Sequence, residues 1–266
     1  MTISRAIRYG IQCAAPGALR RCAALAVIGL GIGVAQTGWA AVGGDDDSPE
    51  HPFKLTTGAY RTSGGDQSAG PALDLNLRYG YGGGNVWIGW YRSVPDGFKQ
   101  TRAGWDHTFD LDWVRLLPSI QIASGGFVGG SFAVETGTRW FVGAGLGRTN
   151  LREYANLNFD PNDSYTVYGG YRWADKSAVS AALIKDNRQY PDQQHVHLVW
   201  RRPKVDGQQL TLDLLFKQGT VEDAFIRRTG LSATYDWPRY FLRLAWDPKV
   251  NFTPQDMVRL SFGVRF

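Results

Sequence analysis

Two short segments place pairs of ionisable side chains at alternate positions. His195-Val196-His197 carries two imidazoles, and Asp110-Leu111-Asp112 carries two carboxylates. Residues i and i+2 of a β-strand point to the same face, so each pair would share one face of a strand. Imidazoles and carboxylates are the usual general acids and bases of hydrolases. The pairs therefore raise the hypothesis of a hydrolytic site, against the simpler reading that His195 and His197 are polar residues on a solvated face.

A much larger set of charged residues also falls at alternate positions, and most of it is arginine. The segment 257–266 is the clearest case, because Arg259 and Arg265 alternate with apolar residues. The apolar residues are Val258, Leu260, Phe262, Val264 and Phe266. This period of two predicts a strand with one apolar face and one basic face. Guanidinium groups on one face would bind anionic groups or pair with carboxylates.

The same alternation recurs along the chain and predicts an all-β protein. The expected strands are 53–61, 72–82, 85–93, 101–111, 116–124, 127–136, 138–148, 164–173, 177–186, 194–202, 209–218, 227–236, 239–247 and 256–266. Each is near the length that a tilted strand needs to cross a bilayer. The pattern is weakest over 116–136 and 177–186. About fourteen strands are therefore expected, with twelve as the alternative.

The connections between these strands alternate in length. Connections 2, 6, 8, 10 and 12 are tight, as at Gly82-Gly83-Gly84 and Trp237-Pro238. Most of the odd ones are longer and polar, namely 62–71, 94–100, 149–163, 187–193, 219–226 and 248–255. One exception is the short link at Ser124-Gly125-Gly126, and the turn at 112–115 is ambiguous. Alternation of short and long connections is typical of transmembrane β-barrels.

The N-terminal region predicts an export signal. Four arginines precede a short apolar run, Ala23 to Ala35, and small residues precede position 41. The apolar run is too short for a spanning helix, which favours a signal peptide over 1–40. Residues 41–52, which include three consecutive aspartates, are expected to form a periplasmic lead-in. The barrel is then expected over 53–266.

Removal of the leader changes the chemistry of the chain. The leader's four arginines supply four of the five net positive charges, which leaves +1 for the rest. Both cysteines, Cys13 and Cys22, lie in the leader. No disulfide, thiolate or cysteine–metal site is therefore expected after residue 40. A near-neutral net charge gives no indication of nucleic-acid binding.

With a leader, alternating strands and a final aromatic residue, the chain resembles the outer-membrane β-barrel proteins of Gram-negative bacteria. The resemblance implies a transmembrane antiparallel β-barrel in the outer membrane. It also implies that Phe262, Val264 and Phe266 form the signal that the barrel-assembly machinery reads. Outer-membrane lipid and lipopolysaccharide are further implied partners. Many Trp and Tyr residues sit at the ends of expected strands, as interfacial aromatic girdles require.

If the apolar faces meet lipid, the charged faces line the lumen, because a charge on the lipid face costs several kcal/mol near the midplane. The candidate lumen-lining residues are Arg78, Arg102, Arg139, Arg172, Arg201, Arg228, Arg239, Arg243, Arg259, Arg265, Asp74 and Asp213. Two arrangements are open. The arginines line a channel or exporter for small hydrophilic solutes, either anionic or saccharide. Alternatively, they pair with acids and fill a plugged structural or surface-interaction barrel.

Two features bear on the space inside the barrel. The inward glycines Gly143, Gly145, Gly230 and Gly263 are expected to leave room in the lumen. The long connection 149–163 could fold inward and constrict it. Fourteen strands enclose more space than the eight of the smallest barrels.

An enzyme is the third reading, because some outer-membrane barrels are hydrolases. Asp110 and Asp112 resemble the acid pair of the omptin-type proteases, but the adjacent Asp-His of that family is missing. The phospholipase-type His-x-Ser is also missing, since Val199 stands two residues after His197. The sequence therefore does not favour an enzyme, and a lumen-rim hydrolase would depend on His195 and His197. No cofactor, metal or nucleic-acid signature is found.

Overall fold

The computed structural model describes residues 50–64, 69–157, 160–221 and 224–266. Its elements are β1 (Phe53–Ser63), β2 (Pro71–Tyr81), β3 (Gly84–Ser93), β4 (Lys99–His107), β5 (Phe109–Leu111), β6 (Val114–Ala123), β7 (Phe127–Thr136), β8 (Trp140–Thr149), β9 (Ser164–Arg172), β10 (Ala178–Asp186), β11 (Gln194–Pro203), β12 (Gln209–Val221), β13 (Ala224–Asp236), β14 (Tyr240–Asp247) and β15 (Asp256–Arg265), with short 3₁₀ turns η1 (Val205–Gly207) and η2 (Val250–Phe252). The predicted signal peptide and most of the lead-in lie outside these ranges.

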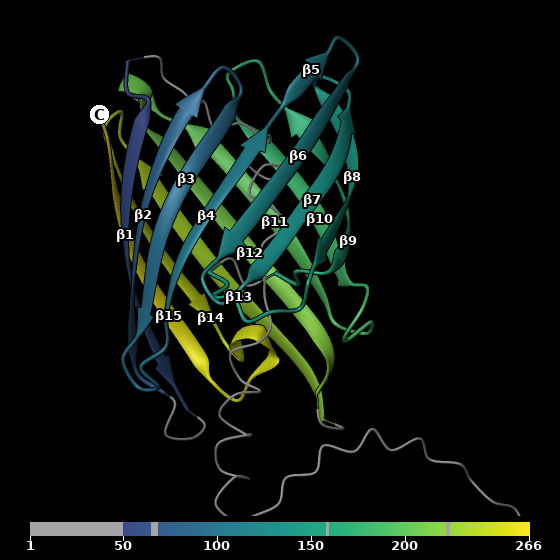
Figure 1. Cartoon of the computed structure of the whole chain (residues 1–266). Helices are drawn as coiled ribbons and strands as arrows, with labels where there is room; N and C mark the ends of the chain where they lie inside the picture. Colours follow the sequence, from purple (N-terminus) through teal and green to yellow (C-terminus); the bar gives the residue numbers. More distant parts are fainter. Residues whose placement is uncertain (1–49, 65–68, 158–159, 222–223) are drawn as a thin grey trace, which may run out of the picture.

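The strands form one closed antiparallel barrel (Figure 1). Strands that follow one another in the chain pair along the wall, except that β4 pairs with β6 rather than with β5, and β1 pairs with β15 to close the wall. At the seam, Phe53 and Phe266 exchange backbone hydrogen bonds of 3.0 and 2.9 Å, and their rings stack 5.7 Å apart. Closure satisfies the backbone groups of both terminal strands, as a bilayer requires.

The wall has fourteen strand positions across the described ranges, because β4 and β5 share one of them. The sequence predicts a continuous strand over 101–111, and this is wrong at Thr108. There the backbone N–H donates to Gly83 O at 2.8 Å, at the end of the β2–β3 hairpin. Beyond that point β5 pairs only with β6 and extends past its neighbours. The twelve-strand alternative is therefore wrong, and strands over 116–136 and 177–186 are confirmed.

Alternating side chains explain why these segments are strands of a membrane barrel. In β15, Met257, Arg259 and Ser261 are buried, whereas Val258 and Leu260 are exposed on the outside. The same alternation in the other long strands builds a continuous apolar outer band. Within the described ranges, no helix combines the length and apolar character needed to span a membrane.

Exposed aromatic side chains gather at the strand ends. At one end of the barrel the outward aromatics include Tyr79, Trp113, Trp140, Trp173, Trp200, Trp237, Tyr240 and Phe266. Trp140 and Tyr171 pack edge to face with centroids 4.8 Å apart, and Tyr171 packs in the same way on Trp173. Amphipathic rings in such positions are typical of membrane interfaces.

The two ends of the barrel differ, as the connection lengths predict. The turn end carries the short links between β2 and β3, β5 and β6, β7 and β8, β9 and β10, β11 and β12, and β13 and β14. The loop end carries the described residues of the longer connections and the short β6–β7 turn. These residues are 64, 69–70, 94–98, 150–157, 160–163, 187–193 and 248–255. The two ends are opposite each other in Figure 1, with the turn end at the top.

Gly137, in a turn-end link, provides a sharp stability test. Its φ of +96° favours glycine, and an added Cβ would lie 2.1 Å from Trp140 O. Gly125 has a similar φ of +90°, but its Cβ would meet open space. An Ala at either position costs about 1–2 kcal/mol for the left-handed backbone. Overpacking adds about 1–3 kcal/mol at Gly137 alone.

We therefore expect Gly137→Ala to lower the free energy of unfolding clearly more than Gly125→Ala does. Denaturant unfolding of the barrel refolded in lipid vesicles measures both. Equal losses for the two variants would contradict the packing of Trp140 against this turn.

Candidate functional site in the barrel lumen

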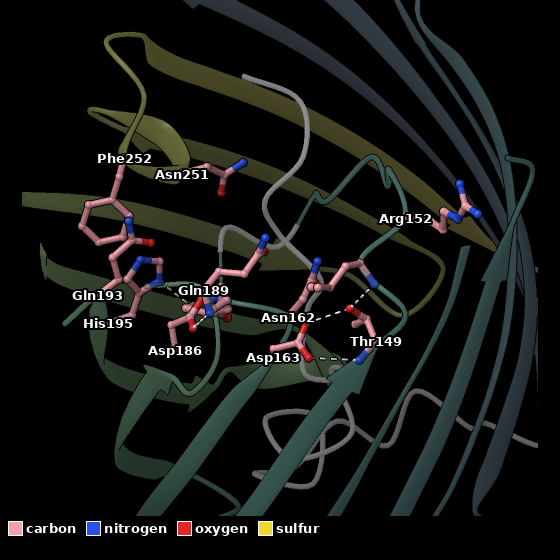
Figure 2. Close-up of a pocket in the computed structure, with 13 residues that line it drawn as sticks. Thr149, Arg152, Asn162, Asp163, Asp186, Gln189, Gln193, His195, Asn251 and Phe252 are labelled. Atoms are coloured by element: carbon pink, nitrogen blue, oxygen red, sulfur yellow. Dashed lines mark hydrogen bonds and ion pairs between the residues drawn. The ribbon is translucent and has the colours of Figure 1, made fainter. Parts of the chain in front are cut away.

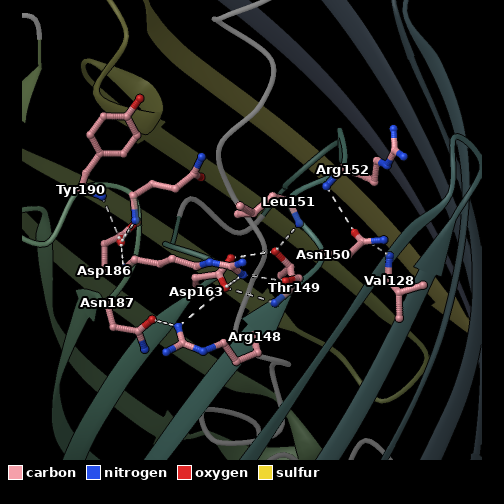
Figure 3. A network of polar contacts seen from close by, with 12 residues as sticks. Val128, Arg148, Thr149, Asn150, Leu151, Arg152, Asp163, Asp186, Asn187 and Tyr190 are labelled. Atoms are coloured by element: carbon pink, nitrogen blue, oxygen red, sulfur yellow. Dashed lines mark hydrogen bonds and ion pairs between the residues drawn. The ribbon is translucent and has the colours of Figure 1, made fainter. Parts of the chain in front are cut away.

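The long connection between β8 and β9 folds into the lumen. We call its described residues, 150–157 and 160–163, the lumen loop. Tyr154 and Ala155 are buried inside the barrel although they belong to a connection. The loop starts at Asn150, whose side chain accepts from Val128 N at 3.1 Å and donates to Gly126 O at 2.8 Å (Figure 3). The first residues of the loop are thereby fixed to the β6–β7 turn.

Asp163 fixes the other end of the loop. Its carboxylate accepts from the backbone and hydroxyl of Thr149 at 3.2 and 2.7 Å (Figure 3). Arg188, from the next loop-end connection, donates to it at 3.2 Å. Because both ends are anchored next to β8 and β9, the middle of the loop is directed across the barrel rather than outward.

Polar side chains of the wall then hold the middle of the loop. Gln100 donates to Glu153 O at 2.8 Å and accepts from Ala155 N at 2.7 Å. Arg102 donates to Ala155 O at 2.9 Å, and the Tyr154 hydroxyl hydrogen-bonds to Gln121 at 2.8 Å. These bonds satisfy backbone groups that would otherwise be buried without partners.

Arg259 extends these contacts to β15, which lies four wall positions from β4 and seven from β8 in the strand order. Its guanidinium donates to Leu157 O at 2.5 Å from β15, whereas Arg102 lies on β4. The loop is therefore held from strands on both sides of the β1–β15 seam. The expectation that the connection folds inward and narrows the lumen agrees with this geometry.

Asp160 attaches the returning part of the loop to two imidazoles. Its Oδ1 lies 3.0 Å from His195 Nδ1 and 3.0 Å from His197 Nε2, and His197 Nδ1 lies 2.9 Å from Asp213 Oδ1. Burial alone would raise the pKa of Asp160. The charge of His197 and the hydrogen bonds from both imidazoles lower the pKa by more than burial raises it. The pKa of Asp160 falls well below its usual value, so this carboxylate is ionised at neutral pH.

A small pocket opens beside this attachment at the loop end. It has a volume of about 20 Å³ and is lined by Asp160, His195 and Phe252, among others. Figure 2 shows His195 and Phe252 on one side of it and Asp163 with Thr149 on the other. The ring of Phe252 stacks on His195 with centroids 5.5 Å apart. His195 is thereby packed between the loop and η2.

A larger cavity lies beside the middle of the lumen loop. We call it the lumen cavity; its volume is about 140 Å³. Its charged lining is Lys54, Arg78, Arg102, Arg243, Arg259, Asp74 and Asp106. Five cations against two carboxylates give the cavity lining a net positive charge. Aromatic rings complete it: Tyr60, Trp87, Trp105, Tyr154 and Phe241.

Ion pairs neutralise part of this charge. Arg102 forms an ion pair with Asp74, and Arg78 lies 3.9 Å from Asp106. Arg243 instead donates to the hydroxyl of Thr234 at 2.9 Å, and Lys54 lies over the ring of Phe241. These contacts hold both cationic side chains in the lining of the cavity.

The remaining predicted lumen residues are placed differently. Arg172 donates to Glu135 at 2.8 Å, and Arg115 pairs with the same carboxylate. Arg265 pairs with Asp236 at 2.8 Å, and Asp213 contacts His197 rather than the lumen cavity. Of the others, Arg201 is half-buried, whereas Arg139, Arg228 and Arg239 are exposed near strand ends, and none of them lines the cavity. A solute contact for these residues stays a prediction.

Two inward glycines do not leave open space, contrary to the expectation. A Cβ at Gly143 would lie 2.3 Å from the Tyr168 ring, and one at Gly263 would lie 1.9 Å from the Phe241 ring. The inward aromatic rings of the neighbouring strands occupy this volume. Glycine is needed there because those rings lie across it.

The two acid–base pairs of the sequence do not meet. Asp110 and Asp112 are exposed at the turn end, whereas His195 and His197 begin β11 at the loop end. The acids that do reach the imidazoles are Asp160 and Asp213. Sequence reasoning missed Asp160 because it lies in a loop 35 residues before His195, and no periodicity marks a loop residue.

Comparisons with known proteins agree with this architecture. The outer membrane protein Omp33 of Acinetobacter baumannii superposes with a TM-score of 0.53 at 11% sequence identity, over 81% of this chain and 98% of that one. The chain has the fold of an outer-membrane β-barrel protein. OmpF of Salmonella typhi, in a complex with daunomycin, superposes with a TM-score of 0.46 at 9% identity, over 80% and 96% of the two chains. The NanC porin gives 0.42 at 10% identity, over 80% and 98%.

Sequence comparison adds no narrower assignment to this barrel fold. No protein-family model matches the chain, and no curated protein matches it.

Proposed function

We propose that the chain is an outer-membrane channel for small hydrophilic solutes, with a preference for anions. The observation that carries the proposal is the lumen cavity, where five cationic side chains face two carboxylates inside a barrel wall. Basic side chains that line a pore concentrate anions and repel cations. The inward loop would set the narrowest part of the path, since it leaves the wall at β8 and reaches Arg259 on β15, seven wall positions away.

Saccharides are the second solute class that fits this lining. The aromatic rings of the lumen cavity stand beside its hydrogen-bond donors, as at Trp87, which lies opposite Arg78 in the pairing of β2 with β3. Flat apolar rings next to polar groups suit the apolar and hydroxyl faces of a sugar. An acidic sugar would use both the rings and the positive charge.

A plugged structural barrel is the alternative, and the hydrogen bonds of the lumen loop favour it. Seven hydrogen bonds join the middle of the loop and Asp160 to the wall. Five come from Gln100, Arg102, Gln121 and Arg259 to the middle of the loop, and two join Asp160 to His195 and His197. If they hold the lumen shut, the barrel conducts no ions. Conductance separates the two readings directly.

We expect the refolded chain 41–266 to give stable ion-permeable steps in a planar bilayer, with a reversal potential that indicates anion preference. The double variant Arg78→Gln/Arg243→Gln should reduce this preference. At roughly 8 Å in water, each charge contributes about 0.5 kcal/mol to the attraction of an anion and the same to the repulsion of a cation. Two charges therefore give about five-fold in the permeability of each ion and about 30-fold in the anion-to-cation permeability ratio.

The matched control is Arg139→Gln/Arg239→Gln, which removes the same charge from exposed positions outside the lumen cavity. It should leave the reversal potential close to that of the parent chain. An equal shift in both double variants would indicate a general charge effect and count against the cavity. A barrel that migrates as folded protein without heating but never conducts would overturn the channel proposal.

A further inference from the structure

One carboxylate and two imidazoles converge where the lumen loop meets β11. The potential ligand atoms of Asp160, His195 and His197 all lie within 4.8 Å of one another, and all three side chains are buried. We propose that these residues form a binding site for a divalent transition-metal ion of the zinc class, which joins the lumen loop to the barrel wall.

The distances are close to those of a metal site. Asp160 Oδ1 lies 3.0 Å from His195 Nδ1 and 3.0 Å from His197 Nε2. Ligand atoms bonded to a tetrahedral zinc ion at about 2.0–2.1 Å are separated by about 3.3 Å. The two contacts of Asp160 would therefore lengthen by a few tenths of an ångström around the ion. The two imidazole nitrogens, which lie within 4.8 Å of each other, would have to reach the same separation.

The donor set selects the class of ion. Two imidazole nitrogens and one carboxylate oxygen are typical of zinc sites that keep an open position. Nickel, copper and iron accept the same donors, so the choice among them depends on geometry and supply. Calcium and magnesium are disfavoured, because they require a shell of six or more oxygen atoms.

A second carboxylate already orients one of the ligands. Asp213 Oδ1 lies 2.9 Å from His197 Nδ1, the ring nitrogen that faces away from Asp160. A carboxylate on the outer nitrogen of a ligating histidine fixes the ring and strengthens its basicity. The chain Asp213–His197–ion would thus match a common arrangement in zinc proteins.

The pocket beside Asp160 and His195 supplies the open position. Its volume of about 20 Å³ holds one water molecule, and polar groups of Asp163, Gln193 and Asn251 surround it (Figure 2). A water there could complete the coordination of the ion.

The neighbouring positive charge is compensated. Lys217 lies opposite His195 in the pairing of β11 with β12, and its ammonium lies 2.5 Å from Asp247 Oδ1. This ion pair reduces the repulsion that a bare ammonium would exert on a bound cation.

The first test is isothermal titration of the tag-free chain 41–266, refolded in detergent, with zinc chloride. We expect one ion per chain. His197→Gln and Asp160→Asn remove direct ligands and should each raise the Kd at least ten-fold. Asp213→Asn should raise it by about ten-fold through the orientation of His197. The matched control is His107→Gln, an imidazole at the turn end, which should leave the Kd unchanged.

A second measurement does not depend on any variant. Cobalt(II) bound to the parent chain should give visible absorption of the intensity typical of four-coordinate cobalt, and zinc should abolish it. Absorption no stronger than that of the free aqueous ion would overturn the site. So would an unchanged zinc Kd in His197→Gln and Asp160→Asn that migrate as folded barrels. Neither result would bear on ion conductance, so the channel proposal is judged separately.

Discussion

Deletion of residues 152–161 should raise the single-channel conductance of the refolded barrel several-fold. The deletion removes the middle of the lumen loop and leaves four residues, Asn150, Leu151, Asn162 and Asp163, between β8 and β9. A loop of four residues is a common connection for an antiparallel pair. The contacts of Asp163 with Thr149 can be retained, because both residues remain. Conductance rises because the narrowest part of a pore limits ion flow.

The control deletion removes Pro95 and Asp96 from an exposed connection at the same end of the barrel. It should leave conductance unchanged, because those residues make none of the bonds that hold the lumen loop. Parent-level conductance in both deletions would show that the lumen loop is not the constriction. The larger deletion should also abolish zinc binding, since Asp160 is lost while His195 and His197 stay.

The barrel wall was largely predictable from the sequence, because its physical cause is local. A bilayer requires every second residue to be apolar, so Val258 and Leu260 mark the strand and its outward face together. The break at Thr108 was not predictable. It coincides with a hydrogen bond from Thr108 N to Gly83 O, 25 positions earlier, and alternation within one strand does not show such a contact.

The site was predictable only in part, because its partners come from a loop. Alternation correctly placed Arg102 and Arg259 on inward faces, but it could not show that both donate to carbonyl groups of 155–157. Nor could it pair His195 with Asp160. The inward direction of the loop depends on the hydrogen bonds of Asn150 and Asp163. In a sequence, polar residues in a connection usually indicate a loop exposed to solvent, so these two residues gave no sign of an inward loop.

The glycine misprediction has a similar origin. A glycine on an inward face reads as empty space when a strand is considered alone. In the barrel, the ring of Phe241 on the adjacent strand fills the space over Gly263, and the ring of Tyr168 fills the space over Gly143. Cross-strand neighbours decide whether the volume of a missing side chain becomes pore or packing.

Asp247→Ala should cause the largest loss of stability of any single substitution considered for this barrel. Lys217 and Asp247 are both almost completely buried, and the ammonium also donates to Lys249 O at 2.8 Å. Removing the carboxylate leaves a buried cation without its counter-charge, which costs about 3–5 kcal/mol. Denaturant unfolding from lipid vesicles measures the loss.

The double variant Lys217→Met/Asp247→Leu distinguishes the cost of the unpaired ammonium from the worth of the pair. Replacing both charges with apolar side chains of similar size should bring the barrel back to within about 1 kcal/mol of the parent. Lys249→Met removes a half-exposed cation that lies 3.7 Å from Asp256, and it should cost less than about 1 kcal/mol. If the double variant is as unstable as Asp247→Ala, the pair itself stabilises the barrel, and the burial argument is wrong. Recovery in the double variant would show that the loop end tolerates an apolar pair and that the cost in Asp247→Ala is the isolated charge.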